Sequence, residues 1–146
     1  MHTLPLLTQQ FVELPPFFYS RVSPEPLTAP YWVAFNTDLA AELNLDTDFQ
    51  TTANLDYLSG NAPQYAPAPI AGVYSGHQFG VYTPRLGDGR ALLIGDSVDA
   101  AGQRQEWQLK GAGKTPYSRF ADGRAVLRSS IREYLCSEAM HGLGIP

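Results

Sequence analysis

Residues 81–95 read VYTPRLGDGRALLIG, with two apolar runs on either side of an Asp-Gly turn. Asp-Gly between apolar runs is a strong short-range signal for a β-hairpin, because both residues accept the positive φ angles of a tight turn. We therefore predict antiparallel strands over Val81–Leu86 and Ala91–Gly95, joined by Gly87–Arg90. The pattern of strands and turns begins at Ile70, so this hairpin sets the fold class of the second half of the chain.

The residues after the hairpin continue the sheet and then change to a helix. Asp99–Gly102 is a second turn signal, and Glu106–Lys110 alternates as a third strand. A polar loop rich in glycine follows from Gly111 to Gly123, and the last element is a helix over Arg124–His141. The predicted fold class is therefore α+β, with a small antiparallel sheet and a C-terminal helix.

The predicted helix has two distinct flanks. Its apolar stripe is formed by Leu127, Ile131, Tyr134 and Leu135. Glu133 falls on another flank, whereas Glu138 lies within the stripe, which is unfavourable for a carboxylate without a partner. The helix is predicted to end at Gly142 in the left-handed conformation, with Pro146 beyond it.

Residues 1–69 have a different composition and are predicted to form an N-terminal extension of the sheet-and-helix domain at 70–146. Residues 1–35 are rich in proline and aromatic side chains, which is typical of extended chain. A short helix capped by Asn36 or Thr37 should follow, with Asn44 at its left-handed exit. A second short helix is predicted over Ala53–Leu58, before a proline-containing loop.

Charge is distributed unevenly along the chain. The net charge is −4, yet nine of the ten basic residues lie between Arg85 and Arg132, a segment with five acidic residues and a net charge of +4. An acidic protein that gathers its cations in one segment favours a local anion site, with a solvated basic face as the alternative. The sequence pI of about 5.2 speaks against nucleic acid as a partner.

The composition, 44% hydrophobic and 16% charged, is that of a soluble globular protein. No apolar run approaches the roughly 18 residues of a membrane helix. The start, Met1–Leu7, lacks the basic residues of a signal peptide. Cys136 is the only cysteine, so an intrachain disulfide is impossible, and we expect a cytoplasmic protein that makes no membrane contact.

Two motifs suggest a P-loop and a metal site, but the sequence around them argues against both. Gly111-Ala-Gly-Lys-Thr115 resembles part of a P-loop, but Gln108 stands where the first glycine belongs, and Pro116 follows where a helix should begin. His77 has no second histidine or cysteine at ligand spacing, which argues against a metal site. A better interpretation is a glycine turn, a strand ending in a lysine, and a helix carboxylate, which is the pattern of a kinase amino-terminal lobe.

Longer strings make a family resemblance specific. They are YSGHQFG (74–80), LGDGRA (86–91), QLKGAG (108–113), TPYSRFADGRAVLRSSIRE (115–133) and, upstream, FYSRVSP (18–24). In these strings the chain resembles the selenoprotein O (YdiU) family over nearly its whole length. The resemblance implies a protein-kinase-like fold that binds ATP in a flipped orientation and transfers AMP to Ser, Thr or Tyr hydroxyls of proteins.

The resemblance also implies roles for individual residues. Those expected to contact the nucleotide are Gly87, Gly89, Arg90, Lys110, Asp122 and Gly123. Glu133 would position Lys110, with Glu138 as the alternative partner. Asp122 could also serve as the N-cap of the helix, and the arginines 124, 128 and 132 could simply be solvated.

Family members run on well past Pro146. The resemblance therefore places the catalytic base and the ligands of Mg²⁺ or Mn²⁺ beyond this chain, which by itself is expected to be inactive. The implied partners are ATP, protein substrates and the remaining C-terminal part of the protein. Two other interpretations stay open at this point, namely a phosphotransferase with the same grip on ATP, and a binding or regulatory module without catalysis.

Overall fold

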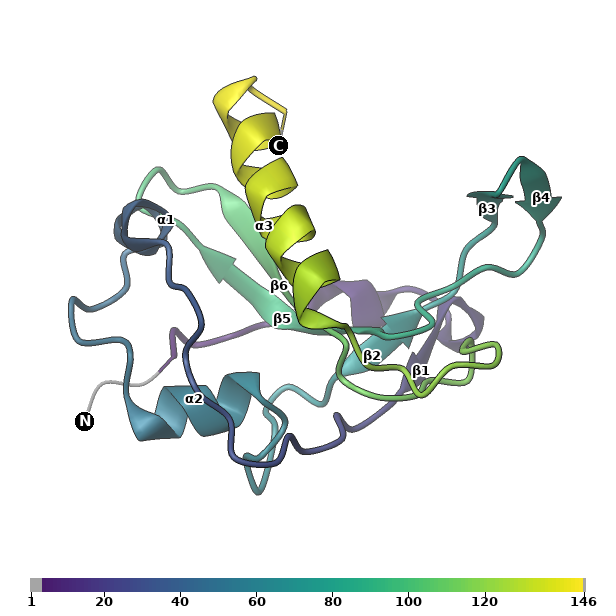
Figure 1. Ribbon diagram of the computed structural model, residues 1–146, viewed down its shortest axis with the longest axis horizontal. Coiled ribbons are helices and arrows are strands. Elements are labelled where there is room, and N and C mark those ends of the chain that lie inside the picture. Colours follow the sequence, from purple (N-terminus) through teal and green to yellow (C-terminus); the bar gives the residue numbers. More distant parts are fainter. Residues whose placement is uncertain (1–3, 146) are drawn as a thin grey trace.

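The computed structural model describes residues 4–145 and contains one four-stranded antiparallel sheet (Figure 1). The strand order is β1-β2-β5-β6. These strands are β1 at Tyr19–Arg21, β2 at Ile70–Gly72, β5 at Ala91–Val98 and β6 at Arg104–Lys110. The α+β class with a small antiparallel sheet and a C-terminal helix is thereby confirmed.

Strand β5 is the centre of the molecule. Leu92, Leu93 and Ile94 are each at most 5% exposed, because both faces of the strand are covered. The core under it joins Leu92 to Ala71 and Tyr117. Burial of a side chain of this size stabilises a fold by about 1.5–3 kcal/mol, so this short apolar run contributes much of the stability of the sheet.

The predicted pairing of residues 81–86 with 91–95 is wrong. Strand β4, Val81–Thr83, pairs instead with β3, Gly76–Gln78, in a separate two-stranded hairpin. Pro84 explains the difference, since it has no N–H to donate and ends the ladder after Thr83. Residues 87–90 therefore form a loop that leads into β5, and β3 was not predicted.

The main hairpin of the sheet is β5–β6, around the second predicted turn. Asp99 closes this turn, because its Oδ1 accepts hydrogen bonds from the N–H groups of Ala101 (2.9 Å) and Gln103 (2.8 Å). The side chain of Gln105 also donates to Asp99, and together these hydrogen bonds lower the pKa of its carboxyl group. The predicted third strand is confirmed, with two more residues at its start.

The short helices follow the prediction closely. Helix α1 spans Thr37–Glu42, and Asn36 is its N-cap, accepting from the N–H groups of Asp38 and Leu39. Asn44 has φ +56° at the exit, as expected. Helix α2 spans Thr52–Leu58 with Thr51 as its N-cap. Two single-turn 3-10 helices, which were not predicted, lie at Gln10–Glu13 and Pro16–Phe18.

Helix α3 spans Leu127–Gly142 and begins three residues later than predicted. Its N-cap is Val126, without a side-chain hydrogen bond, so the interpretation of Asp122 as N-cap is wrong. The left-handed exit is Gly144 (φ +75°) and not Gly142, which lies inside the helix. The predicted apolar stripe is 40–61% exposed, and Figure 1 shows α3 rising from the sheet.

The N-terminal extension is built into the sheet. Strand β1, from the region before residue 69, pairs with β2, from the region after it. Thr8 exchanges two backbone hydrogen bonds with Asp96, and a Cβ on Gly95 (φ +149°) would lie 2.7 Å from the carbonyl oxygen of Thr8. The buried carboxylate of Asp96 is satisfied by the N–H of Gln10 and by Arg104. Residues 1–3 and Pro146 of the predictions above lie outside the described residues.

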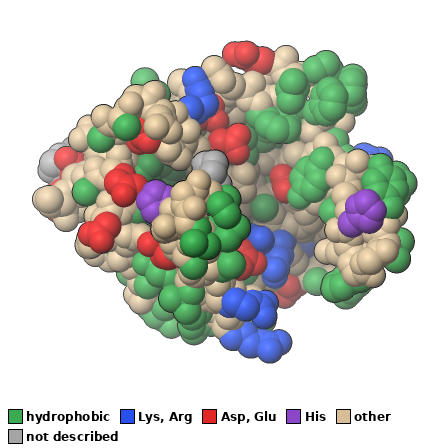
Figure 2. Space-filling view, turned by 90° about the horizontal axis from the view of Figure 1, so that it is seen from above, with side chains coloured by type: hydrophobic (Ala, Val, Ile, Leu, Met, Phe, Trp, Pro, Cys, Tyr) green, Lys and Arg blue, Asp and Glu red, His purple; other side chains and the backbone are tan. Residues whose placement is uncertain are grey.

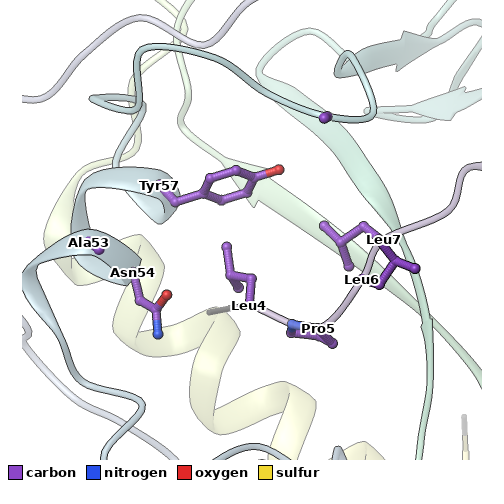
Figure 3. Close-up of a pocket in the computed structure, with 8 residues that line it drawn as sticks. Leu4, Pro5, Leu6, Leu7, Ala53, Asn54 and Tyr57 are labelled. Atoms are coloured by element: carbon purple, nitrogen blue, oxygen red, sulfur yellow. The ribbon is translucent and has the colours of Figure 1, made fainter. Parts of the chain in front are cut away.

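Helix α2 and the N-terminal segment enclose an apolar pocket of about 330 Å³ (Figure 3). Tyr57, Leu4 and Leu7 face this hollow, and the ring of Tyr65 packs against that of Tyr57 with centroids 4.5 Å apart. This pocket is lined by none of the predicted site residues. Within residues 4–145, no helix has both the length and the apolar character needed to span a membrane.

The Tyr57–Tyr65 pair leads to a pH prediction. Burial, followed by the neighbouring Tyr57, raises the pKa of Tyr65 to about 12. Because the fold favours the neutral phenol, its contribution to stability should be complete below pH 10 and be lost as the pH rises through about 12. We expect the tyrosinate absorbance of the native protein minus that of Tyr65→Phe to titrate near pH 12. A midpoint near 10 would show that the ring is solvated.

Candidate nucleotide site

A pocket of about 550 Å³ brings together five of the predicted site residues. These are Gly87, Gly89, Arg90, Lys110 and Gly123. Figure 2 shows Lys and Arg side chains gathered in the hollow between α3 and the β3–β4 hairpin. Four basic residues, Arg90, Lys110, Arg119 and Arg124, therefore line one cavity, as an anion site requires.

The other two predicted residues lie next to this pocket. Glu133 Oε2 is 2.8 Å from Lys110 Nζ, and Glu133 Oε1 is 3.8 Å from Arg90 Nη2. The carboxylate of Asp122 accepts a hydrogen bond from the N–H of Arg124 at 2.9 Å. The alternative partner, Glu138, makes no ion pair with Lys110 in the described part of the chain.

The Lys110–Glu133 ion pair fixes the position of the lysine side chain and contributes little to the stability of the fold. The two side chains are 53% and 43% exposed, and ion pairs of this kind contribute about 0–1 kcal/mol to stability. What the pair does is hold a flexible lysine at the end of β6, with its ammonium group at the pocket. The expected ion pair is present, and its role toward a nucleotide stays a prediction.

The glycine turn, residues 87–90, lines the pocket with its backbone, because the side chain of Asp88 is bonded elsewhere. The carboxylate of Asp88 accepts from the N–H of Gly72 (2.8 Å) and from the hydroxyl of Tyr74 (3.0 Å). Burial, followed by the bond to this carboxylate, raises the pKa of Tyr74. A negative charge inside a basic pocket would repel an anionic ligand, and these two contacts hold the carboxylate beside Gly72 and Tyr74.

The loop at residues 115–118 uses the carbonyl groups of the same turn. Thr115 Oγ1 donates to the carbonyl of Asp88 at 2.6 Å, and Ser118 Oγ donates to the carbonyl of Gly89. Among the described residues, the N–H groups of Gly89 and Arg90 have no acceptor. A turn with its carbonyls bonded and two N–H groups free is a backbone site for anions.

Three residues that sequence reasoning missed support the site. Tyr117 packs beneath Gly87, and Arg85 stacks over its ring at 5.6 Å. Glu25, from the N-terminal extension, contacts Arg124, which is thus engaged and not merely solvated. Nothing in the local pattern around Glu25 marks it, since its partner is 99 residues away. Arg128 and Arg132 are exposed.

The described residues do not supply a metal site. In the range 4–145, no group of three or more His, Cys, Asp and Glu side chains is placed to hold a metal ion. The ring of His77 packs against that of Tyr82, with centroids 5.3 Å apart.

Comparison with known proteins shows the family of the chain. The profile of the family described as "Protein adenylyltransferase SelO" matches residues 5–146. The chain belongs to the SelO family. It is 52% identical to the "Protein nucleotidyltransferase YdiU" of Aliivibrio salmonicida (strain LFI1238), over 96% of this chain and 29% of that protein. It is 58% identical to the protein of the same name from Bordetella parapertussis, over 93% and 28%.

A third relative, the "Protein nucleotidyltransferase YdiU" of Thiobacillus denitrificans, is 52% identical over 100% of this chain and 30% of its own length. The chain thus spans less than a third of the length of these SelO relatives.

Two glycines allow a matched test of how the glycine turn at residues 87–90 packs against Tyr117. Gly87 and Gly80 both have positive φ, but a Cβ on Gly87 would lie 2.7 Å from Tyr117 Cγ, whereas one on Gly80 would meet nothing within 4 Å. We expect Gly80→Ala to lower the free energy of unfolding by about 1–2 kcal/mol, the cost of a left-handed alanine. Gly87→Ala should lose about 1–3 kcal/mol more by overpacking. Denaturant unfolding of both variants measures the difference, and equal losses would contradict the packing of Tyr117 against the turn.

Proposed function

We propose that this chain forms the ATP-binding part of a protein nucleotidyltransferase that moves AMP from ATP to Ser, Thr or Tyr hydroxyls of proteins. One observation carries the proposal: Lys110 and Arg90, both paired with Glu133, line one pocket with the glycine turn at residues 87–90. In protein kinases a glycine-rich loop, a strand lysine and a helix glutamate bind ATP together, and this likeness supports the proposal. The names of the SelO relatives support the reaction class.

The proposed reaction places demands that these residues meet. An acceptor hydroxyl attacks the α-phosphorus of ATP, the bond from that phosphorus to the β-phosphate bridging oxygen breaks, pyrophosphate leaves, and the hydroxyl proton passes to a base. Negative charge grows on the leaving pyrophosphate. Lys110 and Arg90 stabilise that charge, and they do so without reorganisation because Glu133 already holds both.

The remaining predicted residues also contact the nucleotide in this proposal. Gly87 and Gly89 let the phosphates approach the backbone, since neither has a side chain on the pocket. Asp122 and Gly123 would contact the nucleotide from the loop that enters α3. In this proposal the base and the ligands of Mg²⁺ or Mn²⁺ are residues outside the described part of the chain.

The 146-residue chain by itself should not transfer AMP. Nucleotidyl transfer depends on a divalent ion at the phosphates, and residues 4–145 present no cluster of ligands for one. Incubation of the purified chain with α-labelled ATP, Mg²⁺ and a protein acceptor checks this expectation. Label on protein above the level of a Lys110→Ala control would contradict it.

At the natural length of the protein, Lys110 and Glu133 should behave as one unit. Lys110→Ala removes the charge nearest the phosphates, and Glu133→Ala frees the lysine to swing away from them. Loss of a charge-assisted contact costs about 1.5–3 kcal/mol, so each variant should lose at least about ten- to a hundredfold in the rate of AMP transfer. The double variant should lose little more than either single one.

Two controls sharpen this experiment. Glu138→Ala tests the alternative carboxylate and should keep near-normal transfer, and melting curves on the same preparations separate activity from unfolding. Parallel reactions with α- and γ-labelled ATP distinguish AMP transfer from phosphoryl transfer. Additive losses of activity at Lys110 and Glu133 would show that the two residues act independently. If protein acquires label only from γ-labelled ATP, the reaction is that of a phosphotransferase and the proposed AMP transfer is wrong.

A further inference from the structure

A segment of the N-terminal extension crosses the glycine-rich loop at residues 111–124. The segment leaves β1 and runs along the lower side of the molecule in Figure 1. At the crossing, the N–H of Glu25 donates to the carbonyl of Ala112 at 2.8 Å, and Glu25 Oε1 accepts from the N–H of Lys114 at 3.2 Å. Glu25 therefore spans the loop on both sides of Gly113.

Gly113 leaves the space that this crossing needs. Its φ is +108°, and a Cβ there would lie 2.6 Å from both Cγ and Cδ of Glu25. The N–H of Gly113 also donates to the carbonyl of Gly123 at 3.2 Å, so the start and the end of the loop are joined at this point. The side chain of Glu25 is thus seated where the loop closes on itself.

Arg124 ties the end of the loop to the same segment. Its Nη1 donates to the carbonyl of Glu25 and its Nη2 to the carbonyl of Pro26, both at 2.9 Å. Nη2 is also 3.4 Å from Glu25 Oε2. With its guanidinium held by three oxygens of one segment, Arg124 has little freedom to rotate, because planar donors with several partners have a defined geometry.

From Arg124 a chain of polar contacts continues to the lysine of the site. The carbonyl of Arg124 accepts from Arg90 Nη1 at 3.3 Å, Arg90 Nη2 is 3.8 Å from Glu133 Oε1, and Glu133 Oε2 is 2.8 Å from Lys110 Nζ. The N–H of Arg124 is bonded to Asp122. Every charged residue of the predicted nucleotide site is therefore linked to Arg124, directly or through Arg90 and Glu133.

We propose that Glu25 is a positioning residue of this site, which acts through Arg124 to hold the loop at residues 111–124 and the guanidinium of Arg90 in place for the phosphates of ATP. The inference rests on the proposed function, since it names ATP as the ligand. Glu25 does not line the pocket itself. Its contribution is to prevent the loop and Arg90 from losing their arrangement before the ligand arrives.

A graded set of variants at the natural length of the protein tests this role. Glu25→Gln keeps an acceptor for Lys114 and both carbonyls for Arg124, so it removes the charge and the carboxylate oxygen that faces Arg124 Nη2. Arg124→Ala removes all three side-chain contacts. Glu13→Gln is the matched control, because Glu13 is exposed and has no ion pair among the described residues. ATP affinity is measured well below the melting midpoint, together with amide hydrogen exchange over residues 111–124.

We expect Glu25→Gln to raise the Kd for ATP about two- to fivefold, the range of a partly exposed ion pair, and Arg124→Ala to raise it about tenfold or more. Exchange over residues 111–124 should be faster in both variants and unchanged in Glu13→Gln. Because Glu25 acts through Arg124, Glu25→Gln should add nothing to the Kd in an Arg124→Ala background. A role in packing alone would not produce this dependence.

The outcomes separate the two proposals. If the unmodified protein binds ATP and Lys110→Ala abolishes binding, but Glu25→Gln leaves the Kd and the loop exchange unchanged, the positioning role is overturned and the proposed function stands. A lower melting midpoint with an unchanged Kd also overturns it. If the unmodified protein does not bind ATP, both proposals fall.

Discussion

The register between β5 and β6 is the constraint on which the rest of the structure depends. Ala91 pairs with Lys110, and the ladder continues to Val98 opposite Arg104, with one bulge between Leu93 and Gly95. A shift of one residue would turn Lys110 to the other face of the sheet, because side chains alternate along a strand. The register is secured by the burial of β5 and by the ion pair between Asp96 and Arg104 at the far end of the hairpin.

The candidate site combines a buried apolar cluster with half-exposed charges. Tyr117, Leu92 and Ala71 form a buried cluster beneath the glycine turn, and this packing supplies stability. The charged side chains Lys110, Arg90 and Glu133 are 39–53% exposed and contribute little to it. The residues that stabilise the core and the charged residues of the pocket are thus different, so the charges at the pocket can change without weakening the core.

Helix α3 is attached to the rest of the described structure through its polar residues. Glu133 meets Lys110 and Arg90 near the middle of the helix, and His141 Nε2 lies 3.6 Å from Glu42 of α1 near its end. Its apolar residues, Leu127, Ile131, Tyr134 and Leu135, stay at least 40% exposed. Within the described residues, the ion pairs of Glu133 thus join this helix to two of the cations that line the pocket.

The sequence by itself determined the features that depend on neighbouring residues. Asn36 as a cap, Asn44 as a left-handed exit, the strand ending at Lys110 and the turn at Asp99 all follow from local backbone chemistry. The motif strings also named Glu133 ahead of Glu138. Only the tertiary structure decided which strands pair and which distant residues support the pocket. Because of Pro84, β4 pairs with β3 and not with β5, and Glu25 contacts Arg124, which is 99 residues away in the sequence. Such contacts arise when segments pack together, and packing between distant segments leaves no periodic trace in the sequence around either partner.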